Sequence, residues 1–169
     1  MSESPSISAK FSRAVELLDS LSLDDKVQLI ESLPRFWGKS ASYAKVLTEA
    51  FLEDPSDDIV LNTIEVLGRA SLPMGQAGLD CGKDIVEILR KTFERNRSSY
   101  RIVEAVLTQC NSYAKYDSEA TFKIAEEIIG RNLHNLKDEA QSFKDRYDPK
   151  MEEQVQVVAS IQQAFIIDV

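Results

Sequence analysis

The sequence predicts an all-α protein, and three observations support this prediction. Apolar residues recur at spacings of three and four along every long stretch of the chain, which is the period of a helix with one buried face. Only six glycines and five prolines interrupt 169 residues. A composition of 43% hydrophobic and 28% charged residues is that of a folded chain. We therefore expect a single helical domain over residues 1–169, with residues 1–7 flexible.

The first half of the chain is expected to form four helices. The first runs from about Ser8, and the second begins at Ser22, whose hydroxyl can cap it, and ends at Pro34. After a link over residues 35–39, a third helix ends at Asp54-Pro55 and a fourth at Gly68. The residues expected to face inward are Phe11, Ala14, Leu18 and Leu21; Val27, Ile30 and Leu33; Tyr43, Val46, Leu47, Ala50 and Phe51; Ile59, Val60, Ile64 and Leu67.

The second half is expected to begin with a glycine-rich loop over residues 68–82, followed by five further helices. Four of the six glycines fall in this loop. It is longer than a simple turn, so it is either a functional loop or contains a short helical piece. A helix over 136–147 is mostly polar, and Asp148-Pro149 is a strong start signal for the last helix. The apolar faces expected are Ile85, Ile88, Leu89 and Phe93; Tyr100, Val103, Val106, Leu107 and Cys110; Phe122, Ala125, Ile128 and Ile129; Met151, Val155, Val158, Ile161 and Phe165.

The helices come in close pairs, and the pattern repeats with a period near 41 residues. In the segment 46–68, Asp54-Pro55 forms the turn, Ile59 is a buried aliphatic at the start of the second helix, and Leu67-Gly68 ends it. This segment resembles a HEAT repeat. A shift of 41 places Ile59 on Tyr100, and Tyr100-Arg101 is similar to the hydrophobic–arginine pair of that family, although the second unit lacks the proline and the Leu-Gly ending.

The resemblance covers residues 43–110 and implies stacked antiparallel helical hairpins, a HEAT-like α-α superhelix with a long concave face. The alternative is a non-repetitive helical bundle, which buries the same residues but has no such face. Proteins of the HEAT type mostly act by offering surface, so the resemblance implies binding rather than catalysis.

The sequence contains no recognisable catalytic or cofactor motif. Glycines 75, 78 and 82 before Lys83 lack the spacing of a phosphate-binding loop, and the preceding segment is helical. Cys81, expected just before a helix N-terminus, is a candidate reactive thiol, although packing is the more favoured interpretation. His134 is the only histidine and has no ligand partners at metal-site spacing. We expect no cofactor and no metal.

Charge distribution gives the strongest functional signal. The net charge is −8, yet residues 83–101 hold six basic and three acidic residues. We call the six basic residues the basic island: Lys83, Arg90, Lys91, Arg95, Arg97 and Arg101. It is either a surface balanced by internal pairs, which is favoured, or an anion-binding contact. Trp37 is either a core residue, which is favoured, or part of an exposed contact patch.

These observations predict a non-enzymatic protein-interaction or regulatory module that binds an acidic patch on a protein partner. Alternatives are a nucleic-acid binder that uses the basic island, against which the acidic pI argues, and an enzyme of a HEAT-related family without a recognisable motif. A cytoplasmic location is expected, because the chain has only two cysteines, no apolar run of membrane-spanning length, and a polar, acidic N-terminus unlike a signal peptide.

Overall fold

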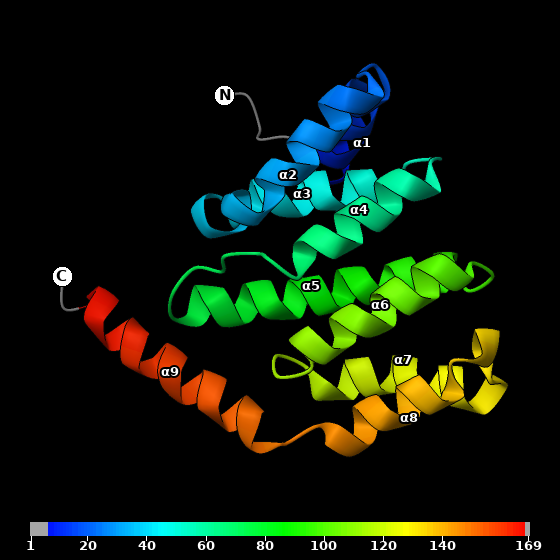
Figure 1. Ribbon diagram of the computed structural model, residues 1–169. Helices are drawn as coiled ribbons and strands as arrows, with labels where there is room; N and C mark the ends of the chain where they lie inside the picture. Colours follow the sequence, from blue (N-terminus) through cyan, green and yellow to red (C-terminus); the bar gives the residue numbers. More distant parts are fainter. Residues whose placement is uncertain (1–6, 168–169) are drawn as a thin grey trace. The chain divides into compact units, whose positions relative to one another are not determined.

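The computed structural model describes residues 7–167, which form α-helices and one short 3-10 helix without a β-strand among them (Figure 1). The all-α prediction is confirmed. The helices are α1 Ile7–Asp19, α2 Leu23–Lys39, α3 Ala41–Leu52, α4 Asp57–Leu67, α5 Gln76–Arg95, α6 Tyr100–Tyr113, α7 Ser118–Arg131, η1 Leu133–Asn135, α8 Lys137–Arg146 and α9 Lys150–Ile167. The expected flexibility of residues 1–7 falls almost wholly outside the described residues, as does the side chain of Phe11.

The chain divides into two compact units, Met1–Ser71 and Leu72–Val169, and the boundary lies inside the glycine-rich segment. In the first unit α1 packs on α3, and α2 packs on α3 and α4. Its core includes Leu18, Leu33, Phe51 and Ile59. The Asp54-Pro55 turn is held from two sides, because the Asp54 carboxylate accepts from the Ser56 backbone N–H and from Lys26 Nζ, at 2.9 and 2.7 Å.

Helix α2 does not end at Pro34, contrary to expectation, but continues through it to Lys39. The continuation brings Trp37 onto the same buried face as Ile30 and Leu33. Because Gly38 has no side chain, the segment that follows α4 can pass close to the end of α2. A Cβ at Gly38 would lie 2.6 Å from the Ser71 carbonyl oxygen. The Ser71 N–H donates to the Pro34 carbonyl at 3.0 Å, so the outgoing chain is fixed against α2.

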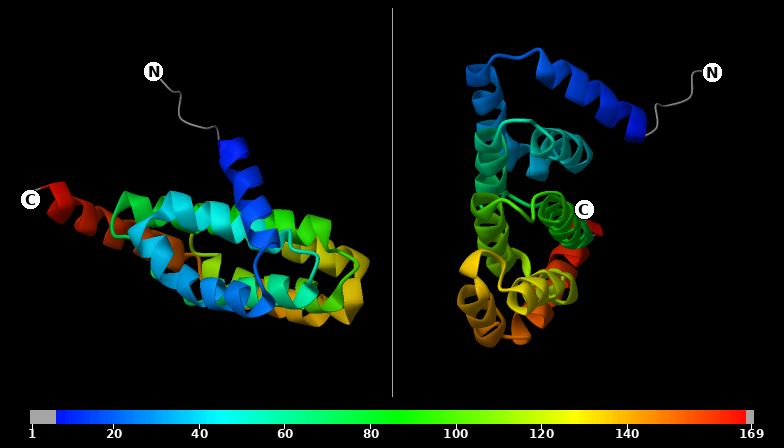
Figure 2. Two further views of the ribbon diagram at one scale, coloured as in Figure 1. Left: turned by 90° about the horizontal axis from the view of Figure 1, so that it is seen from above. Right: turned by 90° about the vertical axis from the view of Figure 1, so that its right-hand side faces the viewer.

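In the second unit α5 is the central helix and contacts α6, α7 and α9, while α7 packs on α8 (Figure 2). Helix α5 begins at Gln76, eight residues before the expected start at Asp84, so the loop expected over 68–82 is limited to 68–75. Gly82 lies inside α5. The Tyr116 ring packs against it, 2.2 Å from where a Cβ would stand, so this position suits glycine. The glycines therefore mark close packing here rather than an extended loop.

Two helical hairpins bury their residues in matching order. Helix α3 buries six residues, and the residues 41 positions later are buried in α5 for all of them but Ala50, whose counterpart Lys91 is exposed. The six residues that α4 buries recur in α6 after 43 positions, not 41, because α5 carries two further residues before its turn. Consequently Tyr100, which the sequence aligns with Ile59, is 47% exposed, and Ile102 takes the buried position instead.

Candidate interaction surface

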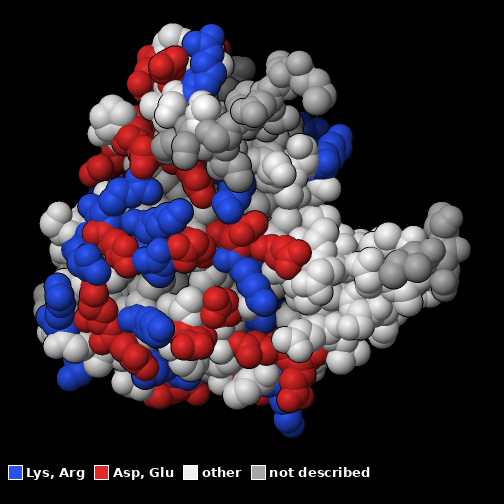
Figure 3. All heavy atoms as spheres, turned by 180° about the vertical axis from the view of Figure 1, so that it is seen from behind, with Lys and Arg blue, Asp and Glu red and all other residues white. Residues whose placement is uncertain are grey.

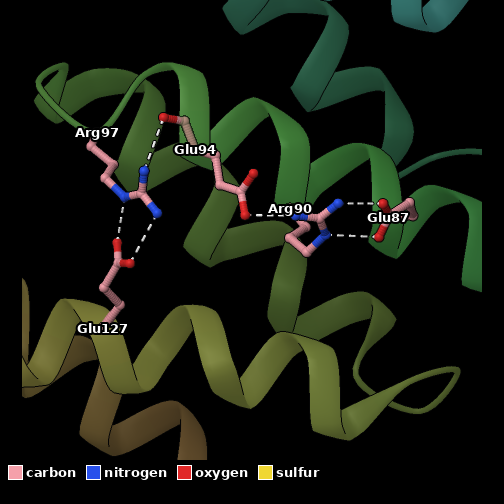
Figure 4. Close-up of polar contacts among 5 residues, drawn as sticks. All are labelled: Glu87, Arg90, Glu94, Arg97 and Glu127. Carbon is pink, nitrogen blue, oxygen red and sulfur yellow. Dashed lines mark hydrogen bonds and ion pairs between the residues drawn. The ribbon is translucent and has the colours of Figure 1, made fainter.

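The basic island lies along α5, the α5–α6 turn and the start of α6, and two of its arginines, Arg90 and Arg97, are held by carboxylates of the same unit. Arg90 binds Glu87 and Glu94 on its own helix, with Nε to Glu87 Oε2 at 2.8 Å and Nη1 to Glu94 Oε1 at 2.6 Å (Figure 4). The hydrogen bond to Glu87 is the main reason that the pKa of Arg90 is raised. The charge of Arg90 is thus balanced by two carboxylates, one a turn before it and one a turn after it on the same helix.

Arg97 joins the α5–α6 turn to α7. Its Nε and Nη2 bind the two carboxylate oxygens of Glu127 at 2.6 and 3.0 Å, and Nη1 donates to the Glu94 carbonyl at 3.3 Å (Figure 4). The hydrogen bonds from Arg97 lower the pKa of Glu127 below its ordinary value of 4.5. A bidentate pair of this kind fixes geometry as well as charge, so Arg97 serves the packing of the second unit.

The other four basic residues of the island, Lys83, Lys91, Arg95 and Arg101, have exposed side chains. On the face seen from behind, basic and acidic side chains alternate rather than gather by sign (Figure 3). The balanced-surface interpretation therefore accounts for Arg90 and Arg97, while binding of an acidic partner by the island stays a prediction.

Trp37 is 1% exposed, so its side chain is not available as a contact residue. Assigning it to an exposed contact patch is wrong, and the core alternative is confirmed. The physical reason is the continuation of α2 through Pro34, which places the indole four residues after Leu33 and seven after Ile30, on the same face of the helix.

The structure places both cysteines in the core and His134 against the α5–α6 turn. Cys81 lies inside α5 and is buried, and burial together with Asp84 and Asp80 raises the pKa of its thiol, opposite to what a nucleophile needs. Burial also raises the pKa of Cys110 to about 12. His134 has φ of 52° and its Nε2 donates to the Arg97 carbonyl at 2.7 Å, so it braces the α5–α6 turn. Within residues 7–167 no three potential ligands are grouped to hold a metal ion.

A shallow groove of about 400 Å³ lies between α6 and α8. Its lining includes two leucines, three carboxylates and one guanidinium. These are Leu107, Leu136, Glu104, Asp138, Glu139 and Arg146.

Helix α9 has the largest group of exposed apolar side chains in the second unit. Phe165 is 70% exposed, Val157 57% and Ile161 55%, and Met151, Val158 and Ile166 are exposed as well. We call Met151, Val157, Val158, Ile161 and Phe165 the α9 apolar stripe; at 100° per residue they cover about a third of the helix circumference. The expectation that Met151, Val158, Ile161 and Phe165 face the core is wrong.

The opposite side of α9 carries Ala159, the half-buried Val155 and polar residues, and it is fixed to the rest of the unit. Ala159 is buried, and α9 packs on α5. The Gln162 and Gln163 side-chain oxygens accept from the backbone N–H groups of Gly75 and Gln76, at 2.9 and 3.0 Å, at the start of α5. At the other end, Glu152 Oε1 accepts from the Ser118 N–H at the start of α7, 3.0 Å away.

These hydrogen bonds explain why α9 turns its apolar residues outward. The first N–H groups of a helix have no partner within it, and the glutamine amides of α9 satisfy two such groups around the α5 start. Rotating α9 to bury Ile161 and Phe165 would remove these bonds. The sequence carried a signal that was missed, because residues 154–167 contain no charged residue and have apolar residues on more than one side of the helix.

No helix in the described part of the chain combines the length and the hydropathy of a membrane span. No protein-family model, curated protein or solved structure matches the chain.

Proposed function

We propose that the protein is a non-enzymatic interaction module, built on HEAT-like helical hairpins, and that its contact element is the α9 apolar stripe. One observation carries the proposal: α9 is bound to its own unit through Ala159 and the two glutamines while its large apolar side chains point to solvent. A contiguous exposed apolar patch of this kind marks an interaction site in folded proteins.

Charge also favours α9 over the basic island as the contact element. Arg90 and Arg97 are engaged by Glu87, Glu94 and Glu127, whereas residues 154–167 carry no charge that association would have to desolvate. We propose a protein partner and a cytoplasmic location, with which two buried free cysteines agree. Within this proposal nucleic acid is not a partner, since the charge available for phosphate contacts is low.

Site-specific photo-cross-linking in cells of the source organism tests the proposal. A photoreactive phenylalanine analogue replaces Phe165 in one variant and Tyr43, an exposed aromatic residue of the first unit, in the control. We expect protein adducts at position 165 that disappear when Ile161→Lys is added, because a lysine in the stripe would have to be desolvated on binding. Adducts that are equal at both positions, or that persist in the Ile161→Lys variant, would contradict the proposal.

A further inference from the structure

We infer that the α9 apolar stripe pairs with the α9 apolar stripe of a second copy of this chain, in an antiparallel two-helix contact. The inference rests on the proposed function, because it names the occupant of the same surface. A two-fold symmetric contact of this kind uses one patch twice and needs no second complementary surface on the molecule.

The distribution of charge selects a second copy as the occupant. A chain with net charge −8 repels its own copies over most approaches, but residues 154–167 are free of charge. The partner for such a stripe has to be apolar and uncharged over the same length, and the chain itself carries one. An anionic lipid surface fits less well, since the stripe contains no lysine or arginine and the whole chain is acidic.

The spacing of the stripe fits a helix pair. Met151, Val158 and Phe165 recur every seven residues, with Ile161 between the last two and Gln154 between the first two, so the seam that two packed helices share would be apolar at four of its five positions. The exposed fractions of the four apolar residues range from 40% to 70%. Helix α9 has 18 residues, about 27 Å in length, so one such pair is a small interface and the dimer forms and dissociates with concentration.

The charges that flank the stripe favour the antiparallel orientation. Glu152 and Glu153 stand in the first turn of α9. Glu152 is held by the Ser118 N–H, but a parallel pair would bring the two exposed Glu153 carboxylates together, whereas an antiparallel pair separates them by the length of the helix. With the two-fold axis near residue 160, Val158 of one copy faces Ile161 of the other.

Sedimentation equilibrium over a range of protein concentration tests the dimer. The wild-type chain should approach twice the 19.0 kDa of one chain, and Ile161→Lys should weaken dimerisation by at least about tenfold, because each dimer would bury two unpaired ammonium groups. Gln141→Lys, which adds the same charge at an exposed position on α8, should dimerise as the wild type does. Circular dichroism should show all three folded.

The orientation is tested with single cysteines, for which the buried Cys81 and Cys110 give little background. A mixture of Val158→Cys and Ile161→Cys should form disulfide-linked dimers under mild oxidation faster than either variant alone. Faster cross-linking of each variant with itself would show a parallel pair and overturn the antiparallel assignment.

Two outcomes overturn the dimer. One is a wild-type chain that stays monomeric at all concentrations, and the other is an Ile161→Lys variant that dimerises unchanged. The proposed function fails separately. If the chain is monomeric yet position 165 cross-links another protein, the interaction role stands and its occupant is different; if adducts are absent from position 165, the interaction role itself is contradicted.

Discussion

Gly82 and Gly130 stand in helices of the same unit with opposite surroundings. A Cβ at Gly82 would lie 2.2 Å from Tyr116 Cγ, and that ring is in turn packed beside Tyr113, with centroids 5.9 Å apart. A Cβ at Gly130 meets nothing within 4 Å. Substituting alanine at each position therefore separates two effects: overpacking, which acts only at Gly82, and the helix propensity of alanine, which acts at both.

Gly82→Ala should destabilise the protein and Gly130→Ala should stabilise it. Overpacking costs about 1–3 kcal/mol, which exceeds the gain of up to about 1 kcal/mol that alanine brings to a helix. At Gly130 only the gain applies, about 0.5–1 kcal/mol. Urea unfolding of both variants measures the difference. Equal changes in the free energy of unfolding would mean that Tyr116 does not pack on Gly82.

At the same scale, spacing rules predicted most buried residues but failed where backbone context decided the outcome. Ile30, Leu33 and Leu89 are buried as expected. Tyr43 is exposed and packs edge-on against Phe36 at 5.4 Å, while the adjacent Ala44 takes the core position. Neighbouring residues point about 100° apart on a helix, so a small error in where the buried face is centred exchanges Tyr43 for Ala44.

Between elements, the Arg97–Glu127 pair is the clearest bond that joins separate helices of the second unit. It ties the α5–α6 turn to α7, and the Arg97 guanidinium also lies over the Phe93 ring, 5.4 Å from its centroid. Charge counting along the sequence placed Arg97 in the basic island. The partner carboxylate is 30 residues away, which no local pattern reveals.

Glu127→Gln should reduce stability near neutral pH, and the reduction should fade in acid. Because Arg97 lowers the pKa of Glu127 in the folded state, the ion pair stabilises the protein above the unfolded-state pKa of about 4.5. Its contribution is lost as pH falls from there through the folded-state pKa. Unfolding free energies of wild type and variant at several pH values measure this. A difference that stays constant below pH 4.5 would contradict the assigned pair.

Helix α9 shows the limit of sequence reasoning at the scale of elements. Its start at Asp148-Pro149 was predicted from local signals, and Asp148 Oδ1 accepts from the Lys150 N–H at 3.0 Å. Its orientation depends on Gln162 and Gln163 reaching residues 87 positions away at the start of α5. A rule that places apolar residues inward therefore predicted the wrong buried face for α9, and the candidate interaction surface was missed.

For the whole molecule, composition and periodicity were sufficient to predict the all-helical class, but not the register of its parts. The buried residues of the hairpins α3–α4 and α5–α6 match after 41 positions in the first helices, except at Ala50, and after 43 positions in the second. Two residues added before a turn shift every later comparison. The period of 41 held as far as Phe93 and failed at Tyr100 for this reason.

At the scale of the whole molecule, α9 is the surface by which we propose that the chain meets another copy. Hydrogen exchange followed by mass spectrometry, at low and high protein concentration, tests this most directly, since pairing suppresses local opening of the helix. We expect slower exchange at high concentration in peptides that cover 154–166, and unchanged exchange in peptides that cover 83–101. Exchange in α9 that does not depend on concentration, or protection that appears over the basic island instead, would contradict the account.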